Sequence, residues 1–262
     1  MKIFKSAVIV LCAIFSICFA ATAVMIIKEN VSDFMINDNV ESLVRNIKYK
    51  DSHRINGLPL SQYQTTGGYA SIETVSEYFG YDSLTEQTVR DSGNKKFSAP
   101  TNIEFYKAIR RELPDYQVTQ YANLKNTEMI DKIYNSLANN MPAVICFAAD
   151  DKKNPGASEQ NGQSEQKWAL HYGVAAGIDM ISRTVTVNDE YGNTAEYSID
   201  DFLKATRFES YENMDFYLRL KIAFGLFNEN TIYIIDQPED ISDVSATNTT
   251  DIKYVNGAAE KN

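Results

Sequence analysis

The sequence contains little that can bind a metal ion or form a disulfide. Only two of its 262 residues are histidine and three are cysteine. Cys12 and Cys18 fall in an apolar stretch near the amino terminus, so Cys146 is the one thiol in the rest of the chain. Zinc clusters and disulfide frameworks need several cysteines, and we therefore expect no metal and no cofactor. Cys146 stands in the apolar run 142–148, which predicts a buried strand position rather than a reactive thiol.

Positive charge is also scarce. The 25 Lys and Arg residues are outnumbered by 35 Asp and Glu residues, which gives a formal net charge of −10. Residues 1–28 hold three of the lysines and no acidic residue, which leaves 22 basic against 35 acidic side chains, a net charge of −13. A surface this acidic repels nucleic-acid phosphates. We therefore exclude nucleic acid as a partner.

The longest uncharged stretch runs from Ser6 to Ile27 and is flanked by lysines. About 20 apolar residues at 1.5 Å rise cross a hydrocarbon core of roughly 30 Å, so the stretch is long enough to span a membrane. We predict a signal anchor in residues 1–28 that leaves the rest of the chain outside the cell membrane, because lysines on its amino side favour an inside position for that end. The alternative is a cleaved signal peptide, with Ala20 and Ala21 near the cleavage site, and a secreted protein.

Polar segments divide the remainder of the chain. Residues 29–57 are predicted to be a stalk or linker, and His53, the first of the two histidines, is predicted to be a solvated residue of that stalk. Residues 58–237 are predicted to form one globular domain, in which the polar run 150–166 is an exposed loop. Residues 238–262 are predicted to be a disordered tail, since they are polar and poor in core-forming side chains.

Helical patterns come first in the domain and strand patterns later. Apolar residues at helical spacing predict helices at residues 69–79, 84–91, 102–113 and 127–139. Short β-rich runs predict strands at residues 144–147, 169–176, 184–188 and 231–235. This order favours an α+β fold over alternating βαβ units.

Two polar residues at strand ends, His171 and Asp189, are the candidates for chemistry. His171 opens one apolar strand, and Asp189 closes the next after an intervening turn. If the hairpin is centred on Met180, the two residues lie directly opposite, with Cβ atoms about 4.5 to 5.5 Å apart, and the carboxylate orients the imidazole. A slip of one residue would set His171 against Glu190 instead. The alternative is a polar strand-end residue that merely faces a carboxylate.

These residues belong to runs that resemble a peptidase family. His-Tyr-Gly-Val-Ala-Ala-Gly-Ile-Asp, followed by Val-Thr-Val-Asn-Asp, resembles the second half of the bacteriocin-processing (double-glycine) peptidases, cysteine peptidase family thirty-nine of the papain-like superfamily. Leu58 to Gly80, which contains Gly-Gly-Tyr-Ala-Ser and ends in Tyr-Phe-Gly, resembles the first half. The resemblance implies a papain-like α+β fold, in which an N-terminal helical half carries the nucleophile-position helix packed on a C-terminal antiparallel sheet. It also implies that His171 and Asp189 are catalytic.

The same resemblance places Gly67 at the position of the nucleophilic cysteine. It places Gln62, or alternatively Gln64, at that of the oxyanion-hole glutamine, and Gln62 is nearer the usual separation. A papain-like hydrolase needs a thiolate at a helix start, and glycine has none. The implied function is a catalytically silent, membrane-tethered, extracytoplasmic peptidase-like domain that binds a peptide or protein partner. One alternative is an active hydrolase with a different nucleophile, such as Thr65, Thr66 or Ser71. Another is a structural surface domain.

Overall fold

One antiparallel sheet of seven strands organises the described part of the chain, which comprises residues 51–60, 68–93, 100–150 and 168–236 together with Ser16 and Ala20. In this computed structural model the strand order is β2-β7-β3-β4-β5-β6, and β1 also pairs with β4. The strands are β1 (Ser52–Arg54), β2 (Gln117–Tyr121), β3 (Ala143–Asp150), β4 (Trp168–Asp179), β5 (Thr184–Asn188), β6 (Thr194–Ser198) and β7 (Ile232–Asp236). The helices are α2 (Tyr69–Tyr78), α3 (Glu86–Ser92), α4 (Asn102–Glu112), α5 (Asn126–Ala138), α6 (Ile199–Thr206) and α7 (Phe216–Ala223), with a 3₁₀ helix, η2 (Glu209–Asn213).

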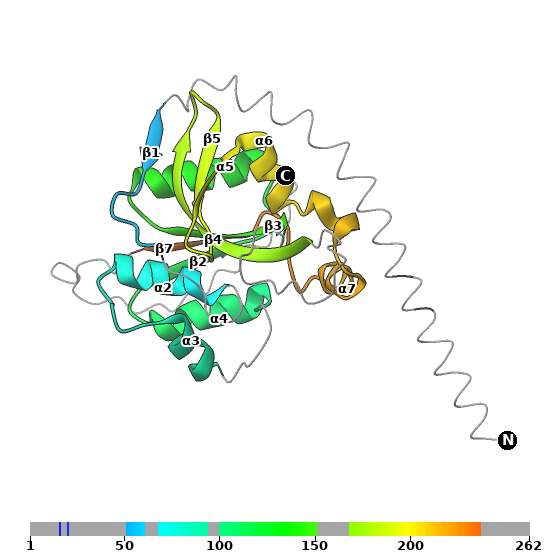
Figure 1. The fold of residues 1–262 in the computed structure, drawn as a ribbon, viewed down its shortest axis with the longest axis horizontal. Helices are drawn as coiled ribbons and strands as arrows, with labels where there is room; N and C mark the ends of the chain where they lie inside the picture. Colours follow the sequence, from blue (N-terminus) through cyan, green and yellow to red (C-terminus); the bar gives the residue numbers. More distant parts are fainter. Residues whose placement is uncertain are drawn as a thin grey trace, which may run out of the picture.

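Helices cover both faces of this sheet (Figure 1). Helices α2, α3 and α4 lie on one face, over a core that includes Ile72, Phe105 and Tyr172. Helices α5 and α6 lie on the other face, over a core that includes Ile133 and Phe202. The predicted α+β class is confirmed, and α2, the helix at the predicted nucleophile position, packs on the sheet.

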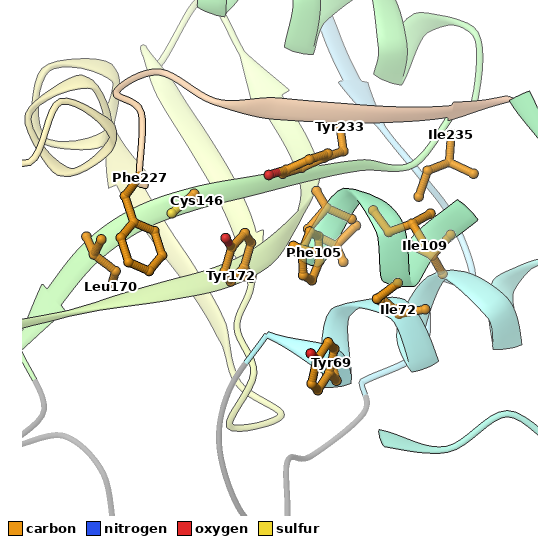
Figure 2. Packing of buried hydrophobic residues seen from close by; sticks show 14 of the residues in the cluster. Tyr69, Ile72, Phe105, Ile109, Cys146, Leu170, Tyr172, Phe227, Tyr233 and Ile235 are labelled. Atoms are coloured by element: carbon orange, nitrogen blue, oxygen red, sulfur yellow. The ribbon is translucent and has the colours of Figure 1, made fainter. Parts of the chain in front are cut away.

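Aromatic stacking and a buried amide fix α4 to the sheet. Phe105 stacks on Tyr172, with ring centroids 4.0 Å apart, and Figure 2 shows Tyr172 and Tyr233 extending from the sheet toward Phe105. Asn102, at the start of α4, is fully buried. Its side-chain amide donates to the Tyr172 hydroxyl oxygen at 3.2 Å, and its backbone carbonyl oxygen accepts from the Tyr233 hydroxyl at 3.0 Å. A buried amide without partners costs about 1 to 3 kcal/mol, so these bonds set where α4 begins.

The predicted element boundaries are close to the observed ones. All four predicted helices are present, and each end lies within two residues of its prediction. The four predicted strands are also present, although β3 and β4 each continue three residues further than their apolar runs. Those extensions are held by pairing between strands, which a pattern of apolar residues does not report.

The domain begins earlier than predicted. Strand β1 falls inside the predicted stalk, residues 29–57, yet it pairs antiparallel with the end of β4. Ile55 is 3% exposed, and the half-buried His53 packs its ring edge-on against Tyr134, with the ring centroids 4.5 Å apart. The sequence Ser-His-Arg has no apolar alternation, so only its pairing with β4 makes it a strand. Strands β2 and β6 and helix α7 likewise have no counterpart among the predicted elements.

Several predictions fall on residues that the structure does not describe. The tail at 238–262 and residues 151–166 of the predicted loop lie outside the described ranges, whereas Asp150 ends β3. The predicted anchor at 1–28 is likewise outside them, apart from Ser16 and Ala20. Among the residues that are described, no helix has both the length and the apolar character that crossing a membrane requires.

The contact between α4 and the sheet predicts a large effect for Phe105→Ala. Phe105 is fully buried against Tyr172, so the truncation should lower the free energy of unfolding by about 3 to 5 kcal/mol, measured by denaturant titration. The matched control is Ile103→Ala in the same helix, because Ile103 is 57% exposed and its loss should change stability by less than about 0.5 kcal/mol. Equal losses for the two variants would contradict this account of the core.

Candidate functional site

The imidazole of His171 lies in a buried polar cluster near the start of β4. Its Nδ1 atom is 2.7 Å from Oε1 of Glu190 and 3.2 Å from the hydroxyl oxygen of Tyr191. The His171 and Glu190 side chains are 4% and 3% exposed. The second carboxylate oxygen of Glu190 accepts the backbone N–H of Tyr172 at 3.4 Å. Both oxygens of this buried carboxylate therefore have hydrogen-bond partners, which offsets the cost of removing it from water.

Asp189 faces its own loop rather than the imidazole. Its Oδ1 atom accepts the backbone N–H groups of Tyr191 and Asn193 at 2.9 and 2.8 Å, and its own N–H donates to the Asn193 carbonyl at 2.9 Å. The predicted contact between His171 and Asp189 is therefore wrong, because Glu190 holds the imidazole. Asp189 shapes the turn that carries Glu190 and Tyr191 to that position. A catalytic role for either His171 or Asp189 stays a prediction.

The pairing of β4 with β5 explains this exchange of partners. Val174 pairs with Asn188, whereas a hairpin centred on Met180 would pair it with Thr186. The register is thus displaced by two residues. A displacement of two preserves which side chains share a face, so Tyr191 takes the place predicted for Asp189.

Two local features produce the displacement. The β4–β5 hairpin has a four-residue loop, residues 180–183, in which Oδ1 of Asp179 accepts the N–H groups of Ile181 and Ser182 at 2.8 and 3.1 Å. This loop pairs Asp179 with Thr184, three residues beyond Ile181, the partner that a centre at Met180 predicts. A β-bulge between Ala175 and Gly177 then moves the register back by one residue, which leaves the displacement of two. Neither feature is visible in the alternation of apolar residues, so the hairpin centre was misplaced in the prediction.

The start of α2 approaches β4 beside His171. Gly67 and Gln62 lie outside the described residues, so their roles stay predictions. Gly68 caps α2 with φ of 109°, and a Cβ atom there would lie 3.0 Å from the Tyr172 ring and 3.1 Å from Pro100. Successive strand residues face opposite sides of the sheet, so the side chains of His171 and Tyr172 lie on opposite faces. Gly68 approaches the face that carries Tyr172, whereas the imidazole lies on the face that α6 covers.

The other candidate nucleophiles that the structure describes are buried away from the imidazole face. Cys146 is fully buried in β3, and burial raises the pKa of its thiol to about 12. Ser71 is 2% exposed in the first turn of α2. Thr65 and Thr66 lie outside the described residues. Cys146 is thus a packed strand residue, as predicted.

A cavity of about 720 Å³ lies over the imidazole on the face of the sheet that α6 covers. Its size is typical of pockets that hold small ligands or parts of larger ones. Four aromatic side chains supply much of its wall: Phe147, Trp168, Tyr191 and Tyr197. Burial, and to a lesser degree the negative charge of Asp189, raise the pKa of Tyr197. The cavity therefore combines large apolar surfaces with a negative field.

The comparison with protein families agrees with the fold. A model of the Peptidase_C39-like family matches residues 36–218, well over half of the chain. The chain belongs to the Peptidase_C39-like family. No curated protein matches the sequence. The predicted relationship to papain-like cysteine peptidases is thus confirmed, and the described domain is peptidase-like.

The match to the Peptidase_C39-like family extends over β1 and over the residues around the imidazole. It begins at residue 36, upstream of β1, which agrees with the inclusion of β1 in the sheet. It spans His171, Glu190 and Tyr191 together. Of the three, sequence reasoning identified His171 and considered Glu190 only as the result of a register slip. Nothing in the sequence singles out Tyr191, since it is one of 16 tyrosines.

The partner of the imidazole is tested by Glu190→Ala. The variant should lose about 1 to 3 kcal/mol of unfolding free energy, because Nδ1 of His171 and the N–H of Tyr172 lose their acceptor inside the domain. Glu196→Ala on β6 is the matched control, since Glu196 is exposed and its loss should cost less than about 0.5 kcal/mol. A Glu190→Ala domain as stable as the control would refute the buried pair.

The state of Cys146 is tested by thiol labelling of the Cys12→Ser, Cys18→Ser protein. At pH 8 the folded protein should react with a maleimide at least about 100-fold more slowly than the denatured protein, because the buried thiol is protonated and covered. The folded-state pKa lies above the ordinary value of 9.0, so the stability linked to this thiol is complete below pH 9 and declines as the pH rises toward 12. Equal labelling rates would mean that Cys146 is accessible.

Proposed function

We propose that this protein is a catalytically silent peptidase-like domain, tethered to the membrane by residues 1–28, that binds a peptide or protein partner outside the cell. The observation that carries the proposal is a positioned imidazole beside a cavity in a domain whose one thiol is buried. Cys146 is the only cysteine after Cys18, and its side chain belongs to the core. His171 and Glu190 therefore remain without the sulfur that a cysteine peptidase requires.

Loss of the nucleophile removes catalysis but leaves binding intact. In a papain-like peptidase the imidazole lowers the pKa of the cysteine and then shuttles its proton, so the members act as a unit. The hydrogen bond that Nδ1–H of His171 donates to Glu190 favours the tautomer in which Nε2 is the basic nitrogen. With glycine at position 67 that nitrogen has no thiol to deprotonate. The cavity walls still present rings and polar groups to a ligand.

The tether is supported by the sequence alone. The uncharged stretch from Ser6 to Ile27 is long enough to span, and the lysines before it favour an outside position for the domain. Membrane fractionation distinguishes an anchored protein from a secreted one, because only the anchored protein needs detergent for release from membranes.

Binding without turnover is the expected outcome in a direct assay. Trp168 is the only tryptophan of the chain and lines the cavity, so its fluorescence reports on occupancy without a label. Titration with a pool of short peptides should change the emission, and mass spectrometry should recover every peptide uncleaved. Cleavage that is abolished by Thr65→Ala, Thr66→Ala or Ser71→Ala would instead establish a hydrolase with a different nucleophile.

The control for catalytic silence is a variant with a cysteine at position 67. The Gly67→Cys variant should react with an active-site-directed thiol reagent, and adding His171→Ala should slow that reaction at least about tenfold. Labelling that does not depend on His171 would contradict the alignment of Gly67 with the family nucleophile.

A further inference from the structure

The walls of the cavity present aromatic ring faces at differing angles. The Phe147 and Tyr197 centroids are 6.3 Å apart with planes at 65°, and the His171 and Tyr191 centroids are 5.5 Å apart with planes at 59°. Rings at these angles do not cover one another face to face. The face of an aromatic ring is electron-rich and attracts a cation within about 6 Å of its centre.

Negative side chains outnumber positive ones around the same space. Asp189, Asp201 and Glu209 line the cavity, and Lys204 is the single lysine or arginine among its described lining residues. Lys204 lies 3.7 Å from Asp201, so this exposed pair largely neutralises itself. Asp189 then gives the cavity a net negative charge.

The field of Asp189 reaches the aromatic wall. Its carboxylate helps to raise the pKa of Tyr197, after the larger effect of burial. Its Oδ1 atom is engaged by the turn, whereas its Oδ2 atom has only a long contact, 3.5 Å, with the amide nitrogen of Asn193. The oxygen that the turn uses least is therefore the one left to interact with a ligand.

We propose that the cavity binds a lysine or arginine side chain of the partner peptide, with the aromatic rings around the alkyl stem and the carboxylates beside the cationic head. This inference rests on the proposed function and names the class of ligand. A cation meets both the ring faces and the excess carboxylates, and the net charge of −10 attracts basic ligands from a distance. An acidic side chain would be repelled, and an apolar one would desolvate carboxylates without compensating them.

A pair of matched pentapeptides tests this ligand class. Acetyl-Ala-Ala-Lys-Ala-Ala-amide and its norleucine analogue have similar stems, but only the first carries a charge. Titrated against the full-length protein and followed by Trp168 fluorescence, the lysine peptide should bind at least about fivefold more tightly. Its affinity should fall as the ionic strength rises, whereas the affinity of the norleucine peptide should hardly change.

Three variants locate the effect in the cavity. Asp189→Asn keeps an oxygen that can accept the turn N–H groups and removes the charge, so it should lower the affinity for the lysine peptide about fivefold. Lys204→Met removes the competing ammonium from an exposed helix position and should raise the affinity for the lysine peptide by about the same factor. Glu196→Gln makes the same charge change as Asp189→Asn on an exposed strand position away from the cavity, and should leave the affinity unchanged.

The possible results separate the two levels of the proposal. Equal binding of the lysine and norleucine peptides would overturn the basic-side-chain inference and leave peptide binding standing. If Nα-acetyl-lysine amide, a single residue with a free side-chain ammonium, binds as tightly as the pentapeptide, the inference that the ligand is a peptide is overturned. If Glu196→Gln lowers the affinity for the lysine peptide as much as Asp189→Asn does, binding in the cavity is overturned, because the overall charge of the protein would then explain the attraction. If neither these pentapeptides nor the peptide pool bind, the proposed function fails as well.

Discussion

The register between β4 and β5 is the constraint on which the site depends. Strand β4 is paired with β3, β5 and β1 and is buried along most of its length, so its side chains have fixed faces. The four-residue hairpin loop and the bulge at Ala175 and Gly177 then decide where β5 ends relative to His171. Because the ladder stops at Asn188, the turn that follows delivers Glu190 and Tyr191 to the imidazole. A different loop length would deliver different side chains.

Asp189 has a structural part in this arrangement. By accepting the N–H groups of Tyr191 and Asn193 it closes the turn, and the closed turn allows Glu190 to reach both the imidazole and the backbone of β4. A short polar side chain that bonds to its own loop is well suited to this purpose. The same carboxylate also contributes charge to the cavity, so one residue links the geometry of the turn to the electrostatics of the cavity.

The two faces of the sheet have separate tasks. On the face of α2 and α4, stacked rings and the buried Asn102 amide hold the helices, and Cys146 is packed among them. On the face of α6, the imidazole and the aromatic walls surround open space. The Cys146 thiol, fully buried in the first face, is therefore separated by the sheet from the imidazole on the second.

The sequence by itself determined four of the helices and four of the strands, the α+β class, the family and the burial of Cys146. Those features depend on local periodicity, on short motifs and on residue types, all of which lie within a few positions of one another. Only the tertiary structure decided that β1 joins the sheet, that Glu190 rather than Asp189 holds His171, and that four aromatic rings enclose a cavity. These depend on backbone pairing, on a bulge and on the packing of side chains far apart in the chain, and no local pattern encodes them.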